Sequence, residues 1–320
     1  MLQTRKLPGV EGAAASQTAT VNMPVNLSYY GILWTLSSDG LDSSSTLGDF
    51  DEIRIKANGK TIYQVDPVHQ NRFNSYMGIP RYEGGADEAQ LLWMPFIRPG
   101  LLDRAEQELT VIGMGYPRVT DPNVADYNPI PITTMQAEID IGSGFSGGVV
   151  RGLAVLGTPR PVGTLRKLKR FYRSISGSGD YQISDLPKGE LIDMIAMNNA
   201  DDIDAVRIER NGYTVYNRTA EENRILTAVG VRKNANTPYD GLSAAPTQTS
   251  VNTLAHQLAN PGIHDYSDSN DWWFVDPAEF GYGAEAMSTN VNDLRITISA
   301  GAAITNLDVY VAYLGGLGGL

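Results

Sequence analysis

The sequence predicts an all-β chain made of two tandem domains, and three observations support this prediction. One stretch of fifteen residues occurs twice, many short apolar runs lie between turn residues, and helix signals are few. The two copies of the stretch lie 153 residues apart in a chain of 320. A period of about 20–50 residues is typical of a solenoid, so a period near half the chain indicates two copies of one domain.

The repeated stretch covers residues 49–63 and residues 202–216, which read DFDEIRIKANGKTIY and DIDAVRIERNGYTVY. Eight of the fifteen positions are identical, whereas about one identity is expected by chance at ordinary residue usage. The identical pairs are Asp49/Asp202, Asp51/Asp204, Arg54/Arg207, Ile55/Ile208, Asn58/Asn211, Gly59/Gly212, Thr61/Thr214 and Tyr63/Tyr216.

Each copy is predicted to form a β-hairpin with a two-residue turn. Asn-Gly between alternating runs favours such a turn, because both central residues need a positive φ. Regular pairing away from the turn predicts an apolar face and a cross-strand Arg–Tyr pair on the other face. The pairs that this register predicts are Ile55 with Ile62, Arg54 with Tyr63, Ile208 with Val215 and Arg207 with Tyr216.

A short helix is predicted after each hairpin. Asp66 followed by Pro67 is typical of a helix N-cap and first helical position. In the second copy, residues 219–222 fit a capping box. Gly78 and Gly230 are the predicted C-terminal ends, where a left-handed residue is expected.

Composition excludes several classes of function. With 19% charged and 42% hydrophobic residues, the chain is globular, and its net charge of −11 argues against an extended nucleic-acid footprint. The chain has no cysteine, which excludes disulfides and thiolate metal sites, and its three histidines have no metal-ligand spacing. The first residues lack the apolar core of a secretory signal, and residues 296–320 alternate like strands and not like a membrane helix.

The order of predicted elements is the same in both halves. After an N-terminal arm, residues 1–16, which is expected to be mobile, the first domain is predicted over 17–158 and the second over 159–320, with Pro159 and Pro161 at the boundary. Long loops are expected at 113–131 and 232–270. Strands are predicted within 18–36 and at 91–94, 108–112, 137–141 and 149–156, then at 191–197, 272–275, 294–299 and 307–314, the last three matching 91–94, 137–141 and 149–156. β-Sandwiches or barrels of this size suit the usual range of domain sizes.

Ser146 is the sharpest candidate for catalysis. Residues 144–148, GFSGG, satisfy the Gly-x-Ser-x-Gly pattern of a nucleophile elbow. An elbow needs a helix after the serine, yet the apolar residues that follow favour a strand. A chymotrypsin-like order needs an upstream histidine, and only His69 qualifies, inside a predicted helix. We therefore favour a turn between two strands and expect no histidine beside Ser146.

Three other features have alternative interpretations. Asp49 with Asp51, Asp202 with Asp204, and the acidic loop 264–271 are candidate calcium ligands, although none fits the EF-hand pattern. A basic run at 166–173 is either a solvated strand edge or a surface that contacts lipid headgroups or another subunit. The tryptophans are expected to pack in a core or interface and not to form a ligand cage: Trp93, Trp272 and Trp273.

Residues 17–78 resemble the N-terminal domain of the major capsid protein of corticovirus-type bacteriophages. The resemblance is carried by four short motifs: residues 30–32, residues 51–55, residues 58–60 and residues 74–78. It implies two tandem eight-stranded jelly rolls with short helices and long loops, and no catalytic set and no cofactor. It also implies trimers that form pseudo-hexameric capsomers over an internal membrane, in contact with neighbouring capsomers and with vertex and membrane-associated virion proteins.

Three functions are therefore compared. The first is a structural capsid protein assembled in the host cytoplasm, with loops 113–131 and 232–270 in the trimer interface. The second is a calcium-assisted carbohydrate-binding β-sandwich. The third is a serine hydrolase that uses Ser146. A trimer in solution would favour the capsid protein. Stabilisation by a sugar would favour the carbohydrate-binding protein, and labelling of Ser146 by a fluorophosphonate would favour the hydrolase.

Overall fold

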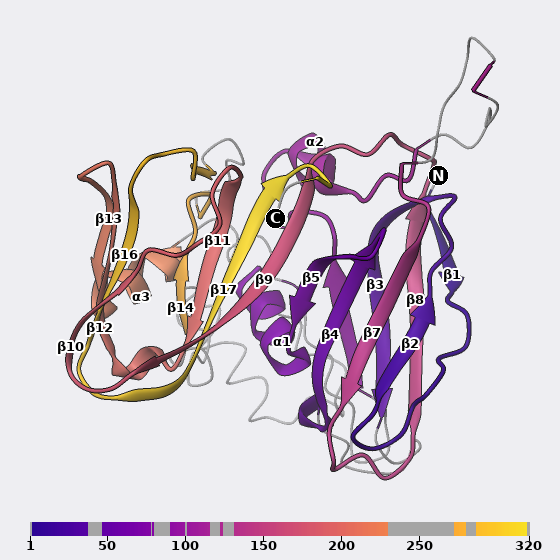
Figure 1. The fold of residues 1–320 in the computed structure, drawn as a ribbon, viewed down its shortest axis with the longest axis horizontal. Coiled ribbons are helices and arrows are strands. Elements are labelled where there is room, and N and C mark those ends of the chain that lie inside the picture. Colours follow the sequence, from indigo (N-terminus) through magenta and orange to yellow (C-terminus); the bar gives the residue numbers. More distant parts are fainter. Residues whose placement is uncertain are drawn as a thin grey trace, which may run out of the picture. The chain divides into compact units, whose positions relative to one another are not determined.

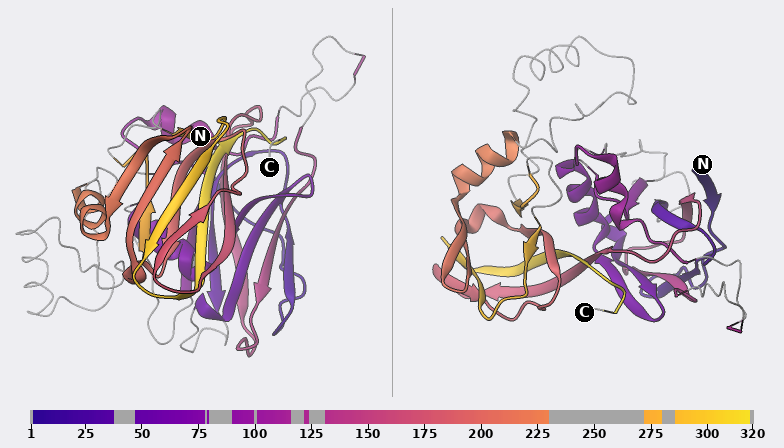
Figure 2. Two further views of the ribbon diagram at one scale, coloured as in Figure 1. Left: turned by 60° about the vertical axis from the view of Figure 1, so that its left-hand side comes forward. Right: turned by 90° about the horizontal axis from the view of Figure 1, so that it is seen from above.

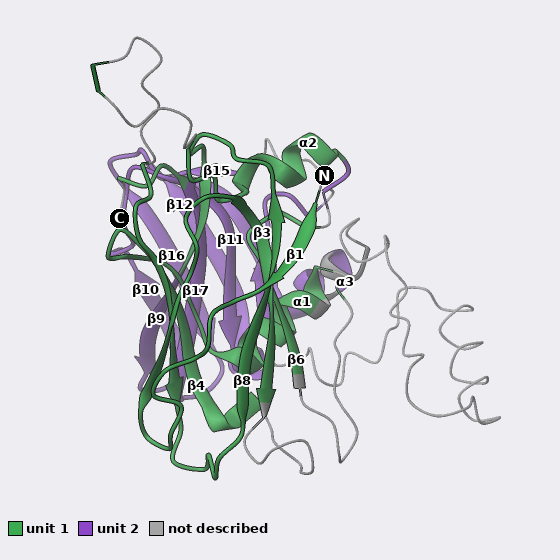
Figure 3. Cartoon of the chain, turned by 90° about the vertical axis from the view of Figure 1, so that its right-hand side faces the viewer, with its two compact units in different colours: residues 1–99, 103–168, 315–318 green, residues 100–102, 169–314, 319–320 purple. Residues whose placement is uncertain are grey.

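The computed structural model describes residues 2–37, 47–77, 79, 90–99, 101–115, 122–123, 131–229, 272–279 and 286–318. The chain divides into two compact units, coloured separately in Figure 3. Unit 1 comprises residues 1–99, 103–168 and 315–318, and unit 2 comprises residues 100–102, 169–314 and 319–320. Both are built mainly from β-strands, as the sequence predicts (Figure 1).

Unit 1 contains two four-stranded antiparallel sheets. Their strand orders are β1-β8-β3-β6 and β2-β7-β4-β5. The bounds are β1 Gln3–Lys6, β2 Thr18–Asn22, β3 Ser28–Ser37, β4 Phe50–Ala57, β5 Lys60–Val65, β6 Gln90–Pro95, β7 Met135–Ile141 and β8 Val149–Gly157. The helical segments are η1 Leu47–Asp49, α1 Pro67–Tyr76, α2 Arg104–Gln107 and η2 Glu108–Thr110.

Unit 2 repeats this arrangement with strand orders β10-β16-β12-β13 and β14-β11-β17-β9. The bounds are β9 Leu165–Ile175, β10 Gly179–Ile183, β11 Leu191–Asn198, β12 Ile203–Arg210, β13 Tyr213–Thr219, β14 Trp272–Val275, β15 Met287–Ser288, β16 Leu294–Ala300 and β17 Ile304–Gly315. The helical segments are η3 Ala200–Asp202 and α3 Ala220–Val229. The short strand β15 pairs with β11 beside the main order. Residues 165–168 of β9 belong to unit 1, where Leu168 lies opposite Tyr63 of β5 in parallel.

Each unit is an eight-stranded jelly roll. In both, the first and last strands lie side by side, β1 with β8 and β9 with β17. The remaining strands fall in the same order, so β6 is equivalent to β14 and β7 to β16. Two sheets built this way bury their inner faces against each other. The strand equivalences predicted from the sequence are therefore confirmed.

Alternating side chains supply the cores. Along β7 the burial alternates residue by residue, so that Ala137 and Ile139 are fully buried and the residues between them are half-buried. Strand β17 buries nearly every residue from Leu307 to Leu314. Figure 2 shows the strands of the chain from two further directions. No helix among the described residues is long and apolar enough to cross a membrane.

The predicted turns and helix starts are confirmed. Asn58 and Gly59 have φ of 49° and 77°, and Asn211 and Gly212 have φ of 48° and 81°. Asp66 Oδ1 accepts hydrogen bonds from the backbone N–H groups of residues 68 and 69, as an N-cap does. In the capping box, the Thr219 N–H donates to Glu222 at 2.9 Å. Gly78 and Gly230 lie outside the described residues.

The predicted register away from the turns is wrong. Ile55 pairs with Tyr63 and not with Ile62, because a β-bulge follows the turn. The second hairpin has the same bulge, so Ile208 pairs with Tyr216 and not with Val215. The predicted Arg–Tyr pairs are consequently not formed. A bulge places two successive residues opposite one, which lets neighbouring apolar side chains turn toward the same side.

Three further segments differ from expectation. Gln3–Lys6, within the predicted mobile arm, form β1 and pair with β8; all four residues are exposed, so the sequence shows no apolar alternation there. Residues 108–112, predicted as a strand, instead contain η2 and follow α2, whose N-cap is Asp103. The run 166–173 was predicted at a surface, yet on β9 Arg166 and Lys167 are 4% and 1% exposed.

Candidate functional site

The repeated element is larger than the hairpin. Each jelly roll contains a hairpin–helix unit, defined as β4, β5 and α1 in the first and β12, β13 and α3 in the second. In the first, the Tyr63 hydroxyl donates to Gln70 of α1 at 2.8 Å; in the second, the Tyr216 hydroxyl donates to Asn223 of α3 at 2.8 Å. Burial raises the pKa of both tyrosines, that of Tyr216 to about 12. Each tyrosine thus ties its helix to the hairpin as a neutral donor.

The turns are fixed to a neighbouring loop in the same way. The backbone N–H of Asn58 donates to the carbonyl of Thr134, and that of Asn211 donates to the carbonyl of Asp293, both at 2.8 Å. The Asn58 side chain makes further bonds, since its Oδ1 accepts from Thr133 and Thr134 and its Nδ2 donates to Pro131. The Asn211 Oδ1 accepts from the Asp293 N–H at 3.1 Å. Asparagine at the turn therefore supplies both the positive φ and an anchor.

A second β-bulge lies at the repeated aspartates of each hairpin. The register between β4 and β7 shifts at Asp51, and that between β12 and β16 shifts at Asp204. Beside each bulge a glycine N–H donates to the carbonyl of the first aspartate of the repeat. These bonds run from Gly142 to Asp49 at 2.8 Å and from Gly301 to Asp202 at 2.9 Å. The backbone carbonyl of the first aspartate in each repeat therefore anchors the start of its strand.

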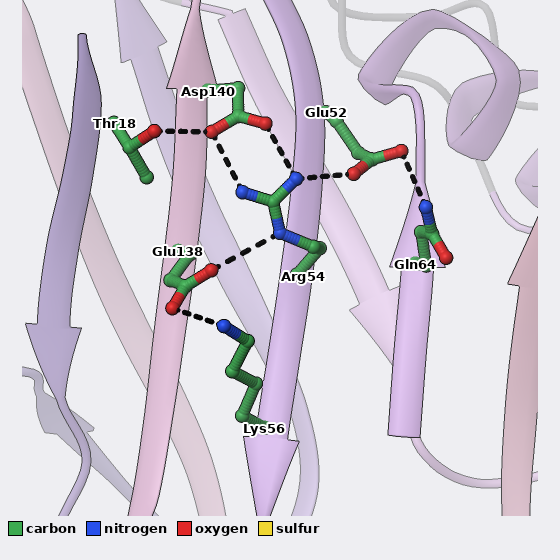
Figure 4. A network of polar contacts seen from close by, with 7 residues as sticks. All are labelled: Thr18, Glu52, Arg54, Lys56, Gln64, Glu138 and Asp140. Atoms are coloured by element: carbon green, nitrogen blue, oxygen red, sulfur yellow. Dashed lines mark hydrogen bonds and ion pairs between the residues drawn. The ribbon is translucent and has the colours of Figure 1, made fainter. Parts of the chain in front are cut away.

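A charged network covers the outer face of the first hairpin–helix unit and joins strands β2, β4, β5 and β7 (Figure 4). The Arg54 guanidinium is its centre and contacts Asp140 at 2.6 and 2.8 Å, Glu52 at 2.6 Å and Glu138 at 3.1 Å. The outer members are Lys56 on Glu138, Gln64 on Glu52 at 2.9 Å and Thr18 on Asp140 at 2.6 Å.

The network holds the carboxylates of Asp140 and Glu138 ionised. Burial raises the pKa of Asp140, but hydrogen bonds from Arg54 and Thr18 outweigh it and hold that pKa below its usual range. Burial likewise raises the pKa of Glu138, and hydrogen bonds from Lys56 and Arg54 lower it by more. Burial lowers the pKa of Arg54, but the hydrogen bonds to Asp140 and Glu52 raise it by more, so the net effect is a raised pKa. The four strands are therefore fastened by charge on their outer face as well as by their core.

In unit 2, the charges lie elsewhere. Arg207, the equivalent of Arg54, contacts Glu209 at 3.5 Å, and its side chain is 44% exposed. The basic run instead supplies Arg170, which forms a bidentate pair with Asp308 at 2.9 and 3.1 Å, with side chains only 10% and 8% exposed. The Arg170 guanidinium also lies 4.6 Å from the centre of the Tyr172 ring. Part of the basic run is thus an internal support of unit 2.

Ser146 lies in a turn between β7 and β8, two strands of one jelly roll. The strand–turn–helix of a nucleophile elbow is therefore not formed. Its neighbour Phe145 is buried and packs edge-on against Phe50 at 5.8 Å, which gives the motif a structural role. His69 lies in α1, and the other two histidines, His256 and His264, are outside the described residues.

No group of three or more histidine, aspartate or glutamate side chains gathers as a metal site within the part of the chain that the structure describes. The acidic loop 264–271 lies outside that part. Trp272 and Trp273 are 8% and 1% exposed, and Trp272 stacks on Phe274, so both belong to the packing of unit 2. Trp93 is half-buried on β6. These side chains do not form an open platform for a sugar ring.

Sequence reasoning missed one surface feature. Tyr213 and Val215 of β13 are 79% and 49% exposed, and Ile225 of α3 is 55% exposed. In the first unit, Ile62 is equivalent to Val215 and is only 3% exposed. At this position the second hairpin–helix unit therefore exposes an apolar side chain that the first one buries, and Tyr213 and Ile225 add exposed apolar surface. The exposure of Val215 is seen only in the fold, because Ile62 and Val215 are both apolar in sequence.

Comparison with known proteins agrees with this architecture. No curated protein matches the chain by sequence. The crystal structure of the major capsid protein P2 from bacteriophage PM2 is similar over 100% of both chains, with a TM-score of 0.73 and 15% identity. The structure of Sulfolobus Turreted Icosahedral Virus matches 99% of this chain and 91% of its own, with a TM-score of 0.60 and 8% identity. A quasi-atomic model of the PBCV-1 virus capsid matches 98% of this chain and 93% of its own, with a TM-score of 0.54 and 8% identity.

Two family profiles match the sequence itself. Residues 4–156 match the N-terminal domain of viral coat protein P2, and residues 165–249 match its C-terminal domain. The two matches follow each other in the order of the two jelly rolls and together span most of the chain. This chain belongs to the viral coat protein P2 family.

Proposed function

We propose that this coat protein assembles as a homotrimer in which six jelly rolls form a ring, the capsomer of an icosahedral virion. The observation that supports the proposal is the presence of two eight-stranded jelly rolls of the same strand order in one chain. A threefold axis triples two such units to six, and heterologous contacts that close into a ring are a common form of protein assembly.

The role is structural and not enzymatic. The repeated contacts, the charged network and the buried Arg170–Asp308 pair all brace strands, and the serine motif forms a turn. We expect the partners to be neighbouring capsomers, vertex proteins and membrane-associated virion proteins, with an internal lipid membrane beneath. Assembly would take place in the host cytoplasm. The domain boundary that we propose for this assembly is residues 17–158 and 159–320, with residues 1–16 as the arm.

The loops 113–131 and 232–270 are proposed to contribute to the trimer interface. Almost all of their residues lie outside the described part of the chain, so the proposal rests on their length and on their apolar residues. Deleting residues 240–260 should weaken the trimer and leave folded jelly rolls. A deletion variant that remains fully trimeric would remove these loops from the interface.

Light scattering of the purified chain tests the proposal directly. The expected mass is three times 34.7 kDa. A monomer at micromolar concentration would contradict it. Stabilisation of the chain by a sugar would favour the carbohydrate-binding alternative, and labelling of Ser146 by a fluorophosphonate would favour the hydrolase.

A further inference from the structure

Among the described residues, β1 and β13 each stand at the end of a sheet, and the pairing of β5 with β9 shows how such an edge can be covered. In unit 1, the outer edge of β5 is covered by the beginning of β9, where Leu168 lies opposite Tyr63 in parallel. Arg166 of the same segment hydrogen-bonds to Tyr63. Leu165 and Leu168 are fully buried there. The junction lies beside Tyr63, which is 1% exposed.

Among the described residues, the strands equivalent to β5 and β9 make no such junction. Strand β13 is equivalent to β5, and β1 is equivalent to β9, since each lies beside the last strand of its jelly roll. Among the described residues, β13 pairs with β12 alone and β1 with β8 alone. Unpaired edges offer rows of backbone donors and acceptors to another strand.

The sequences of β1 and β9 support their equivalence. Residues 5–7 and residues 166–168 both read Arg-Lys-Leu. Leu168 lies opposite Tyr63, and Tyr216 is the repeat equivalent of Tyr63. If β1 and β13 made the same junction, Leu7 would therefore lie opposite Tyr216.

Charge and apolar surface suit this pairing. Strand β1 carries two cations, Arg5 and Lys6, and no anion. The second hairpin–helix unit presents the exposed carboxylates Glu221 and Glu222 in the first turn of α3. Its apolar face at Tyr213 and Val215 borders the free edge of β13. A second strand laid along that edge would remove part of the apolar face from water.

We propose that β13 of one copy of the chain pairs in parallel with β1 of a second copy, with Leu7 of the second copy opposite Tyr216. The inference rests on the proposed homotrimer, in which a neighbouring copy supplies to β13 the strand that the first residues of β9 supply to β5 within unit 1. Around a threefold ring, β1 of each copy pairs with one neighbour and β13 pairs with the other. The edges of β1 and β13 are then paired in all three copies.

Disulfide cross-linking tests the proposal, because the natural chain contains no cysteine. Counting back from Leu7 opposite Tyr216, Thr4 lies near Tyr213, and both are exposed in the single chain. The double variant Thr4→Cys/Tyr213→Cys is oxidised mildly and run on a denaturing, non-reducing gel. A disulfide requires Cα atoms within about 7 Å, so only adjoining strands become linked. The expected product is a covalently closed trimer.

The controls use the repeat itself. Lys60 is the equivalent of Tyr213 and is also exposed, so Thr4→Cys/Lys60→Cys should stay monomeric on the gel. Each single variant should do the same. Covalent dimers from Tyr213→Cys alone would show β13 pairing with itself and overturn the proposal. A linked product within one chain would show that the chain's own β1 covers β13, which also overturns it.

The two proposals fail in different ways. If light scattering gives a trimer but the double variant forms no covalent trimer, the strand pairing is wrong and the trimer stands. If the wild-type chain is a monomer, both are wrong. As a second variant, Val215→Arg should abolish the trimer at concentrations where the wild type is fully trimeric. Leu191→Arg changes an apolar residue that is 41% exposed on β11 and should leave the trimer intact. A trimer that survives Val215→Arg would contradict the pairing.

Discussion

The two hairpin–helix units have nearly the same backbone but different surroundings. Both have an Asn-Gly turn and two β-bulges at the same positions, and both have a tyrosine tied to a helix seven residues later. Yet Ile62 is 3% exposed and Val215 is 49% exposed. The comparison teaches that identical residues specify local geometry, whereas burial is decided by what covers the hairpin. The residues shared by the two hairpins form the turn and the bulges, and the residues that differ contact whatever covers each hairpin.

The largest expected difference in stability is between substitutions of Ile62 and of its equivalent, Val215. Ile62→Ala should destabilise the chain by about 2–4 kcal/mol, because it opens a cavity in a packed core. Val215→Ala should change the stability of the unassembled chain by less than about 0.5 kcal/mol, since the side chain is half in water. Urea unfolding below the concentration of assembly measures both. Equal losses would mean that the two faces are covered alike in the single chain.

The next difference concerns the arginines. Arg54→Met should cost about 2 kcal/mol, because three carboxylates lose a charged hydrogen-bond donor on a half-buried face. Arg207→Met should cost less than about 0.5 kcal/mol, since an exposed ion pair contributes little. The same urea measurement compares them. A large effect at Arg207 would show that the second unit has a charged network that the described contacts do not contain.

The turns should differ less. Asn58→Gly keeps the positive φ and removes the side-chain bonds to Pro131, Thr133 and Thr134, so a loss of about 1 kcal/mol is expected. Asn211→Gly removes the bond to Asp293 and should cost roughly half as much. Thermal unfolding of matched variants measures the difference. The interpretation of asparagine as an anchor would be wrong if both variants were as stable as the wild type.

The smallest effect is a pH dependence in the first unit. The folded-state pKa values of Asp140 and Glu138 are lowered, so their contribution is fully present above the unfolded pKa values of about 4 and is lost as pH falls through the folded ones. In Arg54→Met this contribution is already reduced. The stability gap between wild type and Arg54→Met should therefore narrow by roughly 0.5–1 kcal/mol between pH 6 and pH 3. Urea unfolding at both pH values measures it, and a gap that does not change would contradict the assigned network.

The sequence predicts local features of this fold well. The Asn-Gly turns, the N-cap at Asp66 and the capping box depend on residues within four positions of each other. The bulges have a signal that regular pairing overlooks, because Ile62-Tyr63 and Val215-Tyr216 place two apolar residues in succession. The helix at 104–107 likewise has an N-cap signal, Asp103, just before the segment 108–112 that the sequence predicts as a strand.

Features that depend on distant residues were not predictable. Arg170 is paired with Asp308, 138 residues away, so its burial in a basic run has no local signal. Strand β1 has four exposed polar residues, and only its pairing with β8 defines it. The Arg54 network joins strands β2, β4, β5 and β7, which come from distant parts of the first domain's sequence but adjoin in one sheet. The family resemblance predicts the jelly rolls, and the strand order shows how the repeat produces them.

The pairing of β1 with β8 has a consequence for synthesis on the ribosome. Gln3 lies opposite Leu156, so β1 leaves the ribosome long before its partner strand β8 has been made. Contacts so distant in sequence form slowly, and strand edges exposed in the meantime invite pairing with other chains. The polar and basic composition of Gln3–Lys6 suits this interval, because charged side chains discourage premature edge pairing. The strand that is hardest to recognise in the sequence is thus also the one best suited to remain soluble until its partner is made.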